Sequence, residues 1–357
     1  FSLNYSATHR TQHNLVYVLD ALDAYNKKLV KKIEVKGFQL KNFRGSDGYM
    51  FLEKIIVSPT KPPVAKIELE IKYNKSINRE FRLLNEGDSL YAASGNMEQY
   101  KGFTITSGGI DPISGMVTFT NGEAITAGEV IGDISERDLR RIQIRETIIS
   151  HFKKEEQLFN QGIKTLSLFF IDEVKKYRDY DKEDTKGEYA LIFEQEYASV
   201  LEDLRTLFPS EYIKYLEQWT INKVHNGYFS IDKKTNHSID SSVKRGDEFS
   251  DDVSAYDLIM KDKKKLLSFE EPTRFIFSHS ALREGWDNPN IFQICTLKHS
   301  DSTTTKRQEV GRGLRLCVRQ DGTRMDLDVC GESIHKLNKL TVIASESYKT
   351  FVDDLQK

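Results

Sequence analysis

The sequence predicts an α/β protein in which a parallel sheet, covered by helices on both faces, carries an inserted small antiparallel β module. Two observations support this fold class. Apolar segments alternate with amphipathic helices, which is typical of parallel sheets covered on both faces. These segments are "KTLSLFFID", "TRFIFSHS", "NIFQICTLKH" and "KLTVIASES". Between residues 38 and 132, Gly, Asn, Asp and Ser punctuate short runs, which predicts a mostly antiparallel module.

The first half of the chain follows from hydrophobic spacing and capping residues. Residues 11–29 place apolar side chains on one helical face and lead into an alternating strand, "LVKKIEVKGF". After the β module, residues 133–162 predict one long helix or two consecutive ones. Ser135 is the expected N-cap, and Gly162 is the expected C-terminal stop.

The second half alternates helices and strands more regularly. Two helices flank Pro209, which separates them because proline interrupts a helix. Two further helices are expected at "YDLIMKDKKKLLSF" and "TKRQEVGRGLRL". Residues 174–188 read as a loop, and residues 227–252 read as a short strand followed by a long flexible excursion.

Composition limits the classes of function. With 52 basic and 54 acidic residues the net charge is -2, so any nucleic-acid surface must be local. The three cysteines form no CxxC pair, which fits a reducing, cytoplasmic setting and indicates no metal site. No apolar run reaches the roughly 18 residues that a membrane span needs, so no membrane partner is expected.

The segment "TTTKRQEVGRGLRLCVRQ" carries the strongest chemical signal. At helical spacing, Gln308, Arg312 and Arg315 share one face, and Gly311 and Gly313 interrupt the same turn. Since each helical glycine costs roughly 1 kcal/mol, we expect a close approach to this backbone. Arginine forks match phosphate oxygens, so a triphosphate is the expected ligand. The alternative is a surface helix whose arginines pair with acids.

A second segment, "FIFSHSALREGWDNPNIFQI", joins two apolar strands through a loop that contains Gly285 and Asp287. Loops beyond the carboxyl ends of parallel strands are where such sheets bind ligands. Asp287 can accept a ribose hydroxyl or orient an arginine, and Gly285 permits close backbone approach. An ordinary Gly/Asn/Pro turn is the alternative.

Together these segments resemble the second RecA-like lobe of a superfamily 2 helicase. "ALREGWD" resembles motif V, "QEVGRGLR" resembles motif VI, and "TLSLFFID" lies where motif IV is expected. "YSATHR" resembles motif III, which couples the two lobes through Ser6, Ala7 and Thr8. Further phrases, such as "RRIQIRETIISHF" and "TVIASESYKTFVDDLQK", make the chain similar to the Res subunit of Type III restriction-modification enzymes.

This resemblance implies an ATP-driven DNA translocase within a larger endonuclease. It implies that Arg312 and Arg315 are arginine fingers with Gln308 near the γ-phosphate. Nucleotide contacts are expected from Gly285, Asp287 and Gly311. The expected partners are double-stranded DNA and the modification (Mod) methyltransferase subunit. The DNA contacts that we expect are Ser278, His279, Arg283, Lys31 and Lys32, the last two from a basic cluster that also reads as a solvated lysine face.

The resemblance also divides the chain. Residues 1–37 are expected to end the first lobe and begin the second, residues 38–132 to form the inserted module, and residues 133–357 to form the second lobe. No GxxxxGK[ST] or DEAD/DEAH box occurs. We therefore expect ATP and Mg²⁺ to be held mainly by a first lobe upstream, a nuclease domain to follow downstream, and this fragment alone to hydrolyse no ATP.

Other interpretations remain open. One is a superfamily 2 helicase without a nuclease, and another is a non-catalytic DNA- or protein-binding scaffold. Glu70-Ile71-Lys72 with Asp47 fits part of a PD-ExK nuclease pattern, although an alternating Glu/Lys solvent face on a strand explains it better. His9 and His13 have metal-site spacing, but without a third ligand a non-metal role is favoured.

Overall fold

The fold is that of a computed structural model, which describes residues 17, 19, 21–37, 39–41, 48–132, 134–205, 210–231, 238–239, 263–279, 288–298 and 303–344. The chain forms two compact units. The first consists of residues Phe1–Lys36 and Arg140–Lys357, and the second is Gly37–Leu139. The predicted module, residues 38–132, falls inside the second unit.

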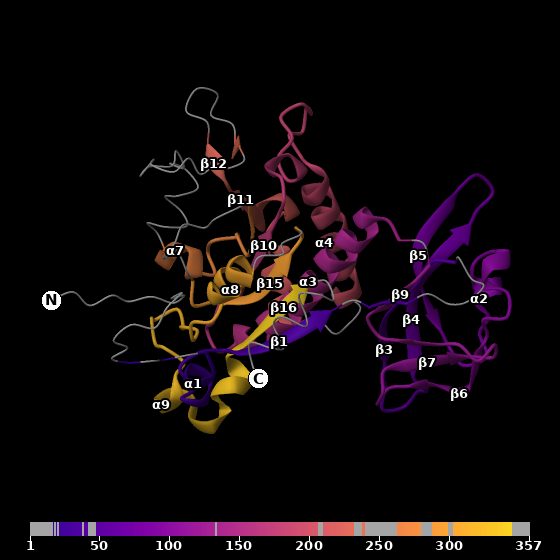
Figure 1. The fold of residues 1–357 in the computed structure, drawn as a ribbon, viewed down its shortest axis with the longest axis horizontal. Helices are drawn as coiled ribbons and strands as arrows, with labels where there is room; N and C mark the ends of the chain where they lie inside the picture. The colour runs from indigo at the N-terminus through magenta and orange to yellow at the C-terminus, as the bar shows by residue number, and fades with distance from the viewer. Residues whose placement is uncertain are drawn as a thin grey trace. The chain divides into compact units, whose positions relative to one another are not determined.

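The first unit is built on a six-stranded sheet (Figure 1). Across the sheet the strands are β1 (Lys32–Gly37), β16 (Lys339–Ala344), β15 (Ile291–Thr296), β10 (Leu166–Phe170), β14 (Phe275–Ser278) and β11 (His225–Tyr228). Pairing is parallel from β16 through β15, β10 and β14 to β11. Because parallel strands need crossover connections, helices lie between them in the chain.

Alternate residues of these strands face two different helical layers. Leu168, Ile276 and Ile294 belong to one apolar cluster with Val310 of α8 (Thr303–Gly311) and Leu266 of α7 (Lys263–Leu267). On the opposite face, β10 and β15 meet α3 (Glu136–Phe159), and Figure 1 shows α3 and α4 (Glu188–Arg205) together on that side. The predicted fold class, a parallel sheet covered on both faces, is confirmed.

The capping of α3 agrees with the sequence. It is one helix of 24 residues, so the prediction of one long helix holds. Ser135 Oγ accepts from the backbone N–H of Asp138 at 3.2 Å, while Asp138 Oδ2 accepts from the N–H of Ser135, which satisfies two helix-end donors reciprocally. Gly162 ends the helix with a φ of +70°, a left-handed conformation that glycine adopts without strain.

The remaining short helices complete the first unit. They are α1 (Ala21–Asn26), η2 (Val174–Lys176), α5 (Glu211–Glu217), η3 (Ile221–Lys223), α9 (Leu327–Cys330), η5 (Gly331–Ser333) and α10 (Ile334–Leu337). Strands β12 (Ser230–Ile231) and β13 (Ser238–Ile239) form a separate antiparallel pair. The segment that carries α9, η5 and α10 was not predicted to form any helix or strand. Within the described residues, no helix is long and apolar enough to span a membrane.

The second unit is the predicted β module, and it is mostly antiparallel. A five-stranded sheet runs β2 (Gln39–Lys41), β9 (Glu129–Ile131), β3 (Met50–Ile56), β4 (Val64–Lys72) and β5 (Ile77–Leu84), with β2 and β9 parallel. A three-stranded sheet is formed by β6 (Ile105–Asp111), β7 (Met116–Phe119) and β8 (Ala124–Thr126). Residues of both sheets share one apolar core, and α2 (Leu90–Ala93) and η1 (Glu98–Tyr100) lie between β5 and β6 in the chain.

Candidate functional site

The helix that carries Gln308 ends earlier than the sequence predicted. α8 stops at Gly311, and the N–H of Arg312 and of Gly313 close a turn onto Glu309 and Val310 at 3.2 and 3.0 Å. Arg315 then pairs with Val30 in a single antiparallel bridge. The prediction that Gln308, Arg312 and Arg315 share one helical face is therefore wrong. The helix ends at Gly311 because the backbone beyond it pairs with the segment before β1 instead of continuing the helix.

The three side chains nevertheless remain close together in the chain at one helix end. Gln308 and Arg315 are exposed, and Arg312 is half-buried. Two guanidiniums and an amide within eight residues retain the donor set that binds phosphate oxygens. The chemical part of the prediction, an anion receptor at this turn, remains a prediction.

The two glycines of this turn have different roles. A Cβ at Gly313 would come within 2.7 Å of Leu340 Cδ1 and 3.1 Å of Ile294 Cδ1. Gly313 is thus needed so that the turn can pack on the sheet, not so that a ligand can approach. A Cβ at Gly311 would meet no described atom within 4 Å. Only Gly311 still fits the expectation of an open backbone beside a ligand.

Lys31 lies inside the protein, which contradicts its prediction as a DNA contact. It is 1% exposed. Its Nζ donates to the carbonyls of Pro289 at 2.6 Å, Ile291 at 2.7 Å and Gly313 at 3.1 Å. Lys32 is exposed, so its prediction as a DNA contact stays open. The alternation of Lys31 and Ile33 inward with Lys32 outward was a signal of this arrangement that counting positive charge missed.

The surroundings of Lys31 are apolar and contain a second buried lysine. Burial lowers the pKa of Lys31 to about 7, and the nearby Cys317 opposes this shift. Burial likewise lowers the pKa of Lys154 to about 8. Both ammonium groups face the ring of Phe292, at 4.6 and 5.2 Å from its centroid. Lys154 Nζ donates to the carbonyl of Leu337 at 2.7 Å.

An ion pair joins α8 to a residue just beyond the end of β15. Glu309, the neighbour of Gln308, is 5% exposed and lies 2.7 Å from Lys298 Nζ. Burial raises the pKa of Glu309, and the charge of Lys298 opposes the rise. Because Lys298 follows the carboxyl end of β15, this pair helps to fix where the helix presents Gln308. No sequence pattern indicates this pair, since the two residues lie in different predicted elements.

Several predicted site residues lie outside the described residues. They are Ser6, Ala7, Thr8, Arg283, Gly285 and Asp287, together with His9, His13 and Asp47. Ser278, the last residue of β14, is 1% exposed, which argues against a direct DNA contact. His279 is half-buried, and its role stays a prediction.

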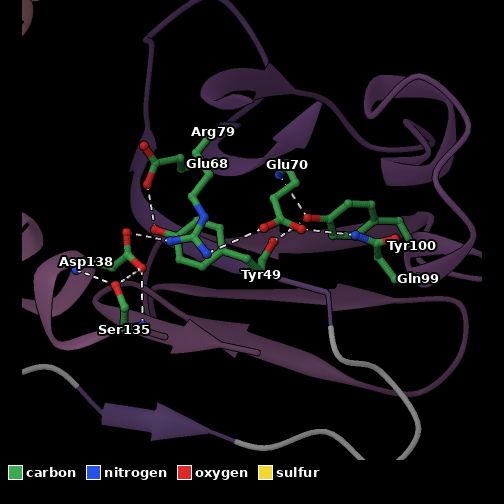
Figure 2. Close-up of polar contacts among 8 residues, drawn as sticks. All are labelled: Tyr49, Glu68, Glu70, Arg79, Gln99, Tyr100, Ser135 and Asp138. Atoms are coloured by element: carbon green, nitrogen blue, oxygen red, sulfur yellow. Dashed lines mark hydrogen bonds and ion pairs between the residues drawn. The ribbon is translucent and has the colours of Figure 1, made fainter. Parts of the chain in front are cut away.

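The PD-ExK alternative falls on a polar network in the β module (Figure 2). Glu70 accepts from Gln99 Nε2 at 3.0 Å and pairs with Arg79 at 3.4 Å. Arg79 also pairs with Asp138 at 2.7 Å and stacks 3.8 Å from the centroid of the Tyr49 ring. Glu70 is thereby engaged in fastening β4 and β5 to the start of α3. No group of three or more potential metal ligands occurs among the described residues.

The interpretation of this strand as a solvent face holds at its end, where Glu70 is half-buried and Lys72 is exposed, but it is wrong for the preceding charged residues. Lys66 and Glu68 are 6% and 3% exposed. Lys66 pairs with Glu53 at 3.1 Å, and Glu68 accepts from Tyr49 Oη at 2.6 Å. At Lys66 and Glu68 the charged face of β4 is therefore buried and internally paired, since a buried charge without a partner would be costly. There it is neither a solvated surface nor an open catalytic centre.

One buried cluster has the order of a hydrolase triad. His151 Nδ1 lies 2.8 Å from Ser167 Oγ, and His151 Nε2 lies 3.4 Å from Glu155 Oε2. All three residues are 0% exposed, so no substrate can reach the hydroxyl in this structure. Ser167 Oγ instead donates to Gln293 Oε1 at 2.9 Å, and the cluster joins α3 to β10 and β15.

The fold and site define an α/β protein with a covered parallel sheet, in which a basic turn follows the helix after β15. No protein-family model matches the chain. Among curated proteins, the chain is 36% identical over 327 residues to the Type III restriction-modification enzyme EcoP15I Res subunit of Escherichia coli and to the EcoPI Res subunit of Escherichia phage P1. It is 31% identical over 334 residues to the StyLTI Res subunit of Salmonella typhimurium.

These matches cover 90%, 90% and 86% of this chain, but only 30% of each relative. The chain thus spans about a third of the length of the curated relatives that it matches. The resemblance inferred from the motifs is confirmed: this chain is related to the Res subunits of Type III restriction-modification enzymes.

Proposed function

We propose that this chain is the second RecA-like lobe of an ATP-driven DNA translocase in a Type III restriction endonuclease. The sequence identity to three Res subunits along nearly the whole chain is the observation that carries the proposal. The parallel sheet with both faces covered and the basic turn after α8 support it. In this proposal residues 1–37 link the lobes through Ser6, Ala7 and Thr8, residues 38–132 are the inserted module, and residues 133–357 form the lobe.

The proposed chemistry is stabilisation of charge during phosphoryl transfer. Arg312 and Arg315 face the γ-phosphate as arginine fingers, with Gln308 beside it, and Gly285, Asp287 and Gly311 contact the nucleotide. An arginine at this point neutralises charge that develops on the transferring group. Mg²⁺ and most phosphate contacts come from a part of the full-length protein outside this chain.

The proposed partners are double-stranded DNA and the Mod subunit. Lys32, His279 and Arg283 are the proposed contacts to the DNA backbone, where positive charge displaces counterions. A nuclease domain elsewhere in the full-length protein cleaves the DNA.

DNA-stimulated ATP hydrolysis by the full-length protein tests this function. Arg312→Ala should lower turnover by about 10³-fold or more, because arginine fingers contribute that much in related phosphoryl-transfer enzymes. Arg324→Ala, which removes another exposed arginine of the same unit, is the matched control and should leave turnover within about twofold of wild type. Wild-type turnover by folded Arg312→Ala protein would overturn the finger assignment.

A further inference from the structure

Three segments that are distant in the sequence meet at the side chain of Lys31. The three carbonyls bound by its Nζ belong to Pro289, Ile291 and Gly313, which lie 258, 260 and 282 residues away. In its protonated form the amine of Lys31 has three N–H donors, so this arrangement uses all of them. A charged donor buried among carbonyls is held firmly, since each unmade bond would leave a buried polar group without a partner.

The backbone around Lys31 binds the same turn as its side chain. The N–H of Lys31 donates to the carbonyl of Leu314 at 2.8 Å. The preceding residue, Val30, pairs with Arg315. Residues 313, 314 and 315 are therefore each bound to residue 30 or 31, and Arg312 directly precedes them. The position of both arginines depends on this short segment before β1.

The other two carbonyls belong to the segment that leads into β15. Asn288 is 1% exposed and its Oδ1 accepts from the N–H of Asn290 at 2.9 Å. Asn290 in turn exchanges two hydrogen bonds with the backbone of Val318, both at 2.9 Å. Lys31 thus joins the start of β15 to Gly313, in the turn after α8. Asn290 joins the same segment to Val318, further along the chain from that turn.

We propose that Lys31 is a positioning residue for ATP hydrolysis: by binding the carbonyls of Pro289, Ile291 and Gly313 it fixes Arg312 and Arg315 relative to the start of β15. This inference rests on the proposed function. Lys31 touches neither nucleotide nor DNA in it, and it acts through the arginines. Misplacing a catalytic group by about 1 Å can cost on the order of 100-fold in rate.

The environment of Lys31 shows what the substitutions Lys31→Met and Lys31→Gln would remove. Its side chain crosses an apolar region beside Phe292 and Cys317, with Lys154 as the other charged neighbour. Methionine would fill a similar volume but would remove the ammonium donor from all three carbonyls. Glutamine keeps two N–H donors on a shorter side chain, so it cannot reach every carbonyl.

The experiment compares Lys31→Met with Lys154→Met in the full-length protein. Lys154 is the matched control, because it is also buried, faces the same ring and donates to a backbone carbonyl, but that carbonyl belongs to Leu337. Per folded molecule, Lys31→Met should lower kcat for ATP by about tenfold or more with a smaller change in KM, since arginine fingers act in the transition state. Lys154→Met should keep kcat within about twofold.

Hydrogen exchange provides a readout that does not depend on activity. Peptides that contain residues 312–316 should exchange faster in Lys31→Met than in Lys154→Met, because the turn loses its anchor. If Lys31→Met fails to fold, Lys31→Gln is measured in the same way and should lower kcat by at least severalfold. A folded Lys31 variant with the kcat and exchange of the control overturns the inference.

Arg312→Ala, measured in parallel, separates this inference from the proposed function. If Arg312→Ala keeps wild-type turnover, the finger assignment itself fails. If Arg312→Ala abolishes turnover while folded Lys31→Met retains it, only the positioning role of Lys31 fails.

Discussion

Replacing Arg274 with Met should destabilise the parallel-sheet unit by about 3 kcal/mol at pH 7. Arg274 and Glu155 are both 0% exposed, and Arg274 Nη1 donates to Glu155 Oε2 at 3.0 Å. Burial alone would raise the pKa of Glu155, but the charges of Arg274 and His151, with hydrogen bonds from His151 and Tyr212, outweigh it and hold the pKa at about 2.

The magnitude follows from this pKa. The net depression from 4.5 to about 2, to which His151 and Tyr212 also contribute, corresponds to roughly 3 kcal/mol, since each pKa unit is worth about 1.4 kcal/mol. Removing one partner of a buried pair costs about 3–5 kcal/mol in other proteins, which agrees. Because the folded pKa of Glu155 lies below its unfolded value, this stability is fully present above pH 4.5 and is lost as the pH falls toward 2.

Urea unfolding, followed by tryptophan fluorescence, measures the loss, since Trp219 and Trp286 both fall within residues 140–357 of the sequence. The difference between Arg274→Met and wild type should be largest near pH 7 and should shrink as the pH falls, because Glu155, whose pKa burial raises once Arg274 is gone, takes up a proton first in the variant. Combining Arg274→Met with Glu155→Leu should recover at least half of the loss, because no buried charge is left alone. A single variant within about 0.5 kcal/mol of wild type at pH 7 would refute the reasoning.

Two further predictions concern the basic turn and the DNA surface. Gly313→Ala should destabilise the protein by about 1–3 kcal/mol through its clash with Leu340, whereas Gly311→Ala, in open space at a helix end, should be neutral or stabilising in thermal unfolding. Equal effects of the two substitutions would contradict the packing argument. Lys32→Ala should reduce the salt slope of DNA binding by about 1, and an unchanged slope would show that this lysine makes no phosphate contact.

The fold was predictable because its signals are local. The apolar segment that became β10 and the capping pair of Ser135 and Gly162 each determine a conformation within a few residues. Hydrophobic runs also indicate a covered sheet without reference to distant partners. The antiparallel module was recognisable for the same reason, since turn residues separate its strands.

The errors arose where distant residues decide the outcome. Helical spacing continued through Arg315, but pairing with Val30 ended the helix at Gly311. Lys31 looked like surface charge because positive charges were counted without regard to the inward alternation of Lys31 and Ile33, and because its three acceptors are backbone carbonyls. The charged face of β4 looked solvated for a similar reason: partners such as Tyr49 and Glu53 come from the neighbouring strand β3 or just before it.

The order in which the two units can fold during synthesis follows from how the chain is divided between them. The β module is one continuous stretch, so all of its strands have left the ribosome before the middle of the chain is made. The edge strand β1 can pair only after β16 has been synthesised. Lys339 of β16 donates to Glu34 of β1, which lies 305 residues earlier in the chain. Because chain segments fold as units during translation, the inserted module should be complete while β1 still lacks its neighbour. The first strand of the six-stranded sheet to be synthesised is thus among the last to pair with its neighbour.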